Sequence, residues 1–234
     1  MTQKKIEAVL TPPPVHMVGD GFRVHGFIPH GSRLLSMQRM DPFVMLDYNS
    51  LYEFPPADHP RGVGVHPHRG FETVTIAYEG SVAHHDSAGN SGVINKGDVQ
   101  WMPAAAGVLH KEYHEADYSR RGGPFQMVQL WVNLPAKDKM SAPKYQGLVN
   151  SDMGRSVLPD GESFIEVIAG EHNGIKGPAS TFTPVHLQNA NLKKGAEASF
   201  SFPAEYTTLA LVIKGSIMVN GQSVRQDNLV LFAK

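Results

Sequence analysis

The chain has 234 residues, of which 41% are hydrophobic and 18% charged, a composition typical of a globular protein with a sizeable core. Its 21 Lys and Arg residues balance 22 Asp and Glu residues, so the net charge of -1 argues against electrostatic capture of nucleic acid or of an acidic membrane surface. The chain has no cysteine, which excludes disulfides and thiolate metal ligands. Any metal must therefore be held by His, Asp or Glu.

Apolar runs are too short for targeting or for crossing a membrane. The first residues, MTQKKIEAVLTPPPVH, contain no apolar stretch of signal-peptide length, and no later segment approaches a membrane span. The absence of cysteine is compatible with a reducing compartment. We therefore expect a cytoplasmic protein.

Short apolar segments separated by Gly, Asn, Asp and Pro predict many short strands rather than helices. In chain order these segments are residues 23–28, 43–48, 73–78, 97–103, 125–134, 163–170, 210–215 and 216–221. One turn of helix is expected within residues 136–145, before Pro143. This pattern favours an all-β sandwich or barrel.

A weak internal repeat divides the chain in two. TVTIAYEGSV, from Thr73, aligns with TLALVIKGSI, from Thr208, and both copies carry a Gly-Ser pair. The shared pattern predicts two copies of one β unit, with a metal-binding domain at residues 1–140 and a second domain at residues 141–234. At the same offset, Ser201 and Pro203 replace the two histidines described below, so only the first copy is equipped for metal chemistry.

The second copy ends soon after its counterpart of residues 95–103. Either N-terminal strands complete the second barrel, or the chain is a shortened version of a longer protein. We favour shortening and an incomplete second barrel, because an unclosed sheet leaves unpaired edges.

Histidines are concentrated in the first unit, where seven of the 12 lie between residues 59 and 114. Residues i and i+2 of a strand point to the same face. His66 and His68 therefore project together, and His110 shares a face with Glu112. Two such strands can place three imidazoles and one carboxylate around a cation. Glu72 competes for the carboxylate position, because it has the parity of His68 if the strand is unbroken.

The remaining histidines of this region receive different interpretations. His59, His84 and His85 lie in polar, loop-like surroundings and are not expected to be ligands. For His114, a supporting position beside the ligands and an exposed position both remain open. His-x-His alone is a moderate signal; followed some forty residues later by a Gly-Asp turn and G-x-x-H-x-E, it is much more specific for a metal site.

The motifs HPHRGFETVTIAYEG (residues 66–80) and GDVQWMPAAAGVLHKE (residues 97–112) resemble the pirin family of the cupin superfamily, whose bacterial members include quercetin 2,3-dioxygenase-like proteins. DPFVMLDYN, residues 41–49, also resembles a segment of that family. The resemblance covers most of the chain and is weakest after residue 140. It implies two cupin-type jelly-roll barrels.

The resemblance offers two ligand sets that share His66, His68 and His110. The general cupin pattern adds Glu72, whereas the pirin variant takes the carboxylate two residues after the last histidine, at Glu112. We select Glu112, because the LH-x-E signature is intact and parity puts its side chain beside His110. Glu72 then becomes a supporting or structural residue.

Three imidazoles and one carboxylate leave coordination positions open, which suits Fe(II), Mn, Co or Ni better than a closed zinc site. The resemblance implies iron, with Cu and Zn as further alternatives. It also implies a dioxygenase that opens a flavonol such as quercetin with O2, releasing a depside and carbon monoxide. Glu112 is then the candidate base.

The resemblance also leaves two other functions open. The first is a non-enzymatic, metal-dependent redox sensor that binds a transcription factor or a metabolic enzyme. The second is a different dioxygenase or an isomerase on the same scaffold. In the enzymatic interpretation, apolar side chains are available to line a pocket, although ordinary packing is expected for most of them: Phe43, Met45, Phe71, Trp101, Met102 and Met127.

Overall fold

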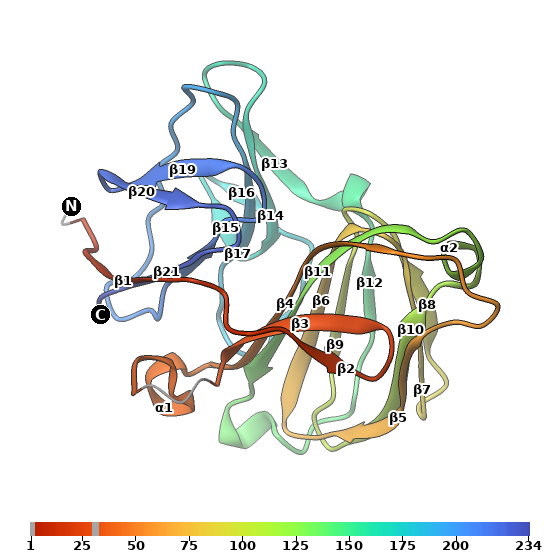
Figure 1. The fold of residues 1–234 in the computed structure, drawn as a ribbon. Coiled ribbons are helices and arrows are strands. Elements are labelled where there is room, and N and C mark those ends of the chain that lie inside the picture. The colour runs from red at the N-terminus through yellow and green to blue at the C-terminus, as the bar shows by residue number, and fades with distance from the viewer. Residues whose placement is uncertain (1–2, 30–32) are drawn as a thin grey trace.

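The computed structural model describes residues 3–29 and 33–234, and its regular secondary structure consists mainly of β-strands (Figure 1). The all-β prediction is confirmed. Each of the eight predicted segments contains a strand, and the expected helical turn is a 3-10 helix at Ala136–Asp138. The other helices are short: the 3-10 helices Arg33–Leu35 and Asn150–Asp152, α1 (Met37–Met40) and α2 (Ala116–Arg121).

A seven-stranded antiparallel sheet forms the centre of the molecule. Its strands are, in spatial order, β12 (Gln146–Leu148), β9 (Val99–Pro103), β6 (Phe71–Glu79), β11 (Gly123–Asn133), β4 (Phe43–Phe54), β3 (Phe22–Ile28) and β2 (His16–Val18).

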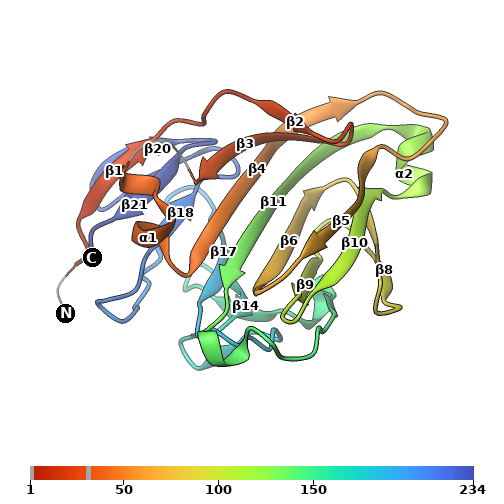
Figure 2. The same ribbon diagram turned by 90° about the horizontal axis from the view of Figure 1, so that it is seen from below.

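A four-stranded sheet lies against one face of the large sheet (Figures 1 and 2). Its order is β5 (Gly62–His68), β10 (Val108–His114), β7 (Val82–Asp86) and β8 (Ser91–Ile94). The turn between β2 and β3 joins the two sheets at one end, where Asp20 N donates to Gly62 O at 3.2 Å and Gly62 N donates to Asp20 Oδ1 at 2.7 Å. The two sheets thus enclose a common interior.

The C-terminal strands form a second group on the opposite face of the large sheet (Figure 1). They make two three-stranded sheets and two hairpins. The sheets are β1 (Ile6–Leu10), β21 (Leu229–Phe232) and β18 (Leu209–Leu211), and β13 (Gly154–Val157), β14 (Phe164–Ala169) and β17 (Leu187–Asn191). The hairpins are β15 (Glu171–His172) with β16 (Ile175–Lys176), and β19 (Ser216–Val219) with β20 (Gln222–Arg225).

The N-terminal strand β1 pairs with β21, so the first residues of the chain belong to a C-terminal sheet. The repeat seen in the sequence recurs as strand pairing, since β6 pairs with β9 as β18 pairs with β21. The equivalent pairs are Val74 with Trp101 and Ile76 with Val99 in the first copy, and Leu209 with Leu231 and Leu211 with Leu229 in the second. The domain limits drawn from the sequence stay a prediction.

Alternate residues of the large sheet face two different environments. Val74 and Leu130 point to the main apolar core, which also contains Ile168 and Leu231 of the C-terminal group. Their neighbours point into the interior between the two N-terminal sheets. Among the described residues, no helix is long and apolar enough to cross a membrane.

Candidate metal centre

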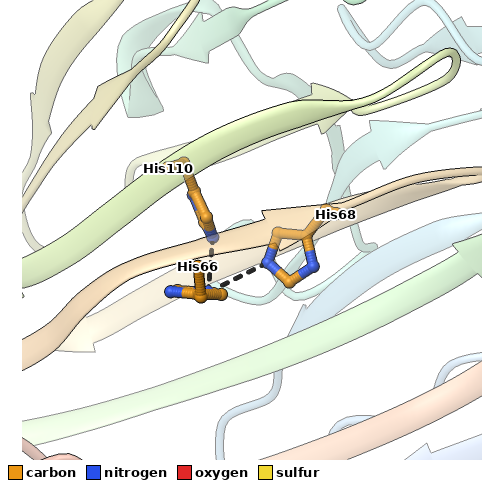
Figure 3. Close-up of side chains that lie close together, drawn as sticks. All are labelled: His66, His68 and His110. Carbon is orange, nitrogen blue, oxygen red and sulfur yellow. Dashed lines mark hydrogen bonds between the residues drawn. The ribbon is translucent and has the colours of Figure 1, made fainter.

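Three histidines converge between the two N-terminal sheets, and we call His66, His68 and His110 the histidine cluster (Figure 3). The Nε2 atom of His66 lies 3.1 Å from Nε2 of His68 and 2.9 Å from Nε2 of His110. One ring nitrogen from each residue lies within 4.8 Å of the other two. Because His66 and His110 are opposite each other in the pairing of β5 with β10, both rings face the interior.

The protonation state of two of these histidines suits a metal. Burial, together with the neighbouring imidazoles, lowers the pKa of His68 and of His110 to about 3. Both rings are therefore neutral at physiological pH, which is the form that coordinates a metal. The convergence of three ring nitrogens and the absence of sulfur fit a transition-metal ion.

Glu112 lies beside the cluster, as its parity with His110 predicts. Strand β10 alternates buried and exposed residues, and Glu112 Oε2 is 4.0 Å from His110 Nε2. The opposite sheet holds both carboxylate oxygens: Thr75 Oγ1 donates to Oε1 at 3.2 Å, and Gln129 Nε2 donates to Oε2 at 2.8 Å. Glu112 is thus a buried carboxylate fixed in orientation next to three imidazoles.

Glu72 points to the other side of the large sheet. Strand β5 ends at His68, and Gly70, with a φ of 79°, reverses the chain before β6 begins, so the parity that would have placed Glu72 with the histidines is lost. The Glu72 carboxylate accepts hydrogen bonds from Trp101 Nε1 at 3.1 Å and from Phe182 N at 3.3 Å. Burial raises its pKa. Glu72 therefore lies at the contact with the C-terminal group, away from the cluster.

His84 is the functional candidate that the sequence reasoning missed. It lies in β7 directly opposite Glu112 and is buried, rather than in a loop. Its Nδ1 atom is 3.2 Å from Nδ1 of His110 and 3.2 Å from Nε2 of Gln100. The signal in the sequence is the alternation of Val82, His84 and Asp86, which marks one face of a strand.

The other histidines lie elsewhere. His59 is exposed, and His85 points outward to the hydroxyl of Tyr113. His114 is buried, contrary to the exposed alternative, and its Nε2 donates to the carbonyl of Gly21 at 2.7 Å. It packs among aromatic rings at a distance from the cluster, so it supports the fold rather than the ligands.

Two aromatic rings flank His68. The Phe71 ring lies 5.2 Å from the His68 ring, and the Trp131 ring lies 5.0 Å from it. Phe71 and Trp131 stack on each other at 4.4 Å. Trp131 was not among the expected pocket residues. Most of the others pack in apolar clusters: Phe43 and Trp101 in the main core, Met102 in a small cluster with Val108, and Met127 in a cluster with Phe54 and Phe125.

Comparison with known proteins agrees with this geometry. The Pirin family model matches residues 21–132. A Pseudomonas aeruginosa protein, provisionally named a quercetin 2,3-dioxygenase, is 46% identical over 216 residues, which make up 92% of this chain and 74% of that protein.

Solved structures agree with the sequence match. A quercetin 2,3-dioxygenase from Acinetobacter baumannii has a TM-score of 0.91 and 43% identity, over 99% of this chain and 80% of that one. A bacterial pirin from Escherichia coli, solved with nickel(II), has the same fold, with a TM-score of 0.68 and 18% identity over 96% of this chain and 88% of that one. The fold, the sequence match and the histidine motifs together show that this chain belongs to the pirin family.

Proposed function

We propose that this chain is a metal-dependent dioxygenase that opens the central ring of a flavonol, such as quercetin, with O2. The observation that carries the proposal is the convergence of three imidazoles with one buried carboxylate at their side. Its support comes from relatives at 43% and 46% identity that are named quercetin 2,3-dioxygenases.

His66, His68, His110 and Glu112 would hold the metal, for which we propose Fe(II); Mn, Co, Ni, Cu and Zn are the alternatives to test. A bound divalent ion would supply Lewis acidity for an anionic substrate oxygen and bring substrate and O2 together. Two imidazoles come from β5 and the third from β10, so the pairing of these two strands sets the spacing of the ligands.

Glu112 is the proposed base that takes the proton of the flavonol 3-hydroxyl. Thr75 and Gln129 donate to its two oxygens and hold the carboxylate towards the cluster. The substrate anion then reacts with O2. Both oxygen atoms enter the products, one ring carbon leaves as carbon monoxide, and no external reductant is required.

Phe71 and Trp131 suit a flat aromatic substrate. Their stacked rings form an apolar wall beside His68, against which a flavonol ring could pack while its oxygen atoms reach the cluster. Such a wall would also exclude water from the reacting atoms.

The test is turnover by metal-loaded protein. Protein freed of metal and reloaded separately with each of the six metals is mixed with quercetin under nitrogen and then exposed to O2. We expect loss of flavonol absorbance and release of carbon monoxide with at least one metal, and no reaction by the Glu112→Ala variant. Absence of turnover with all six metals would contradict the proposal.

A further inference from the structure

A row of four polar side chains crosses the inner face of the large sheet. Asp47 of β4 lies opposite Gln129 of β11, Gln129 lies opposite Thr75 of β6, and Thr75 lies opposite Gln100 of β9. Directly opposite residues in an antiparallel pair point to the same face. Since Gln129 and Thr75 donate to Glu112, all four side chains of the row face the interior that contains the histidine cluster.

Asp47 differs from the rest of the row because its carboxylate accepts no hydrogen bond from the described residues. Gln129 and Thr75 hold Glu112, and Gln100 contacts His84. No hydrogen-bond donor of the described residues reaches the carboxylate of Asp47, which is half-buried. Burial raises its pKa to about 6, and nearby His16 partly offsets that effect. At neutral pH Asp47 is thus mainly an ionised acceptor without a donor.

Asn49 lies two residues further along β4, on the same inner face. It is 1% exposed, and among the described residues neither its amide nitrogen nor its amide oxygen has a hydrogen-bond partner. Buried polar groups in folded proteins nearly always have partners, so Asn49 keeps an unused donor and an unused acceptor beside Asp47.

Gly26 lets the carboxylate of Asp47 lie close to the backbone of β3. Gly26 lies opposite Asp47 in the pairing of β3 with β4. A Cβ atom at Gly26 would come within 3.3 Å of Asp47 Oδ1 and within 3.4 Å of the His16 ring. A side chain at this position would press against the Asp47 carboxylate, and glycine avoids that contact.

We propose that Asp47 and Asn49 form a hydroxyl-binding subsite that holds a ring hydroxyl of the flavonol remote from its 3-hydroxyl. Asp47 accepts the hydrogen bond of this hydroxyl, and the Asn49 amide donates to its oxygen. Gln129 lies between Asp47 and Glu112, so the subsite is one strand, about 4.8 Å, beyond the residue that holds the proposed base. That offset is on the scale of a fused two-ring system.

The inference rests on the proposed flavonol substrate and deepens it, since it makes the protein selective for polyhydroxylated flavonols. Quercetin carries hydroxyls on its outer rings, whereas 3-hydroxyflavone carries only the 3-hydroxyl. The two ligands therefore differ in the groups that the subsite would bind and share the group that faces the metal centre.

The experiment is a binding cycle under nitrogen with metal-loaded protein. Both ligands are titrated by absorbance into the wild type, Asp47→Asn and Asn49→Leu. We expect the wild type to bind quercetin more tightly, and each variant to weaken quercetin binding by roughly tenfold to a hundredfold while leaving 3-hydroxyflavone binding unchanged. Glu53→Gln, which removes a charge from an exposed position of β4, should change neither affinity.

The variants must retain their metal and their cooperative unfolding. If such variants bind both ligands more weakly to the same extent, or bind neither more weakly, the subsite is overturned. Binding without O2 separates this outcome from the proposed function. If the binding cycle discriminates but no turnover follows with any metal, the subsite stands and the dioxygenase proposal fails. If turnover occurs and the variants do not discriminate between the ligands, the subsite alone fails.

Discussion

The Nδ1 atoms of His84 and His110 lie 3.2 Å apart in the interior between the two N-terminal sheets. If His110 carries its proton on Nδ1 and donates it to His84, its Nε2 lone pair is free and directed towards the cluster. His84 Nε2 then carries the other proton, 3.6 Å from Asp86 Oδ2. His84 is therefore placed to fix the tautomer of a proposed ligand.

Replacing His84 with alanine should weaken metal binding without removing any proposed ligand. Loss of such a supporting contact typically lowers metal affinity by about tenfold to a hundredfold. Competition against a chelator of known affinity measures the change. His85→Ala is the matched control, since this neighbour in β7 points outward to Tyr113. Equal metal affinity in His84→Ala and in the wild type would show that the contact has no positioning role.

Glu112→Gln should lower the metal content of the protein, and Glu72→Gln should leave it unchanged. Glu112 lies 4.0 Å from a cluster nitrogen, whereas Glu72 is held by Trp101 and Phe182 on the other side of the sheet. We therefore expect Glu112→Gln to lose most of its metal and Glu72→Gln to keep it, as measured by elemental analysis after purification without chelator. A loaded Glu112→Gln together with an empty Glu72→Gln would reverse the ligand assignment.

Metal should stabilise the folded chain, because the cluster is assembled by pairing of β5 with β10 and is absent from an unfolded chain. At a free metal concentration of 100 times Kd, the gain in unfolding free energy is about 2.7 kcal/mol. For a chain of this length that corresponds to a rise in Tm of about 5 to 10 °C. Calorimetry with and without metal measures it. His110→Ala should abolish the rise, and the exposed His59→Ala should preserve it.

The sequence predicted the parts of this structure that depend on local alternation. Strand β10 alternates as expected, so the placement of Glu112 beside His110 follows from parity alone. Alternation alone cannot predict where a strand ends. The reversal at Gly70 separates Glu72 from His68, and the choice of Glu112 came from its parity with His110 together with the resemblance to the pirin family.

Contacts between strands that are distant in the sequence could not be predicted in the same way. The polar surroundings of His84 predict a loop, and nothing local shows that β7 pairs with β10, which places His84 opposite Glu112. Asp47 and Asn49 belong to the segment of residues 41–49 that resembles the pirin family, and the sequence predicts no function for either residue. The role proposed for them depends on the register of β4 with β11, which puts them on the face of Gln129.

Glu72 should make stability depend on pH in a direction opposite to that of an ordinary paired carboxylate. Its pKa is raised in the folded state by burial, so the folded chain binds more protons than the unfolded chain between the ordinary pKa and the raised one. The free energy of unfolding contributed by Glu72 therefore falls as pH rises through this window, by about 1.4 kcal/mol for every tenfold difference in proton affinity between the folded and the unfolded chain. Above the raised pKa it stays level.

Glu72→Gln removes this titration and leaves one amide oxygen to accept from Trp101 or Phe182. Urea unfolding of both proteins should give a difference in unfolding free energy that moves in favour of the variant as pH rises from about 4.3, the ordinary pKa of glutamate. Histidine titrations occur in both proteins and cancel in this difference. For Glu53→Gln, a change at an exposed position of β4, the free energy of unfolding should depend on pH as it does in the wild type. If the unfolding free energy of Glu72→Gln also has the pH dependence of the wild type, Glu72 has the same pKa in the folded and the unfolded chain. Its burial between the sheet and the C-terminal group would then carry no electrostatic cost.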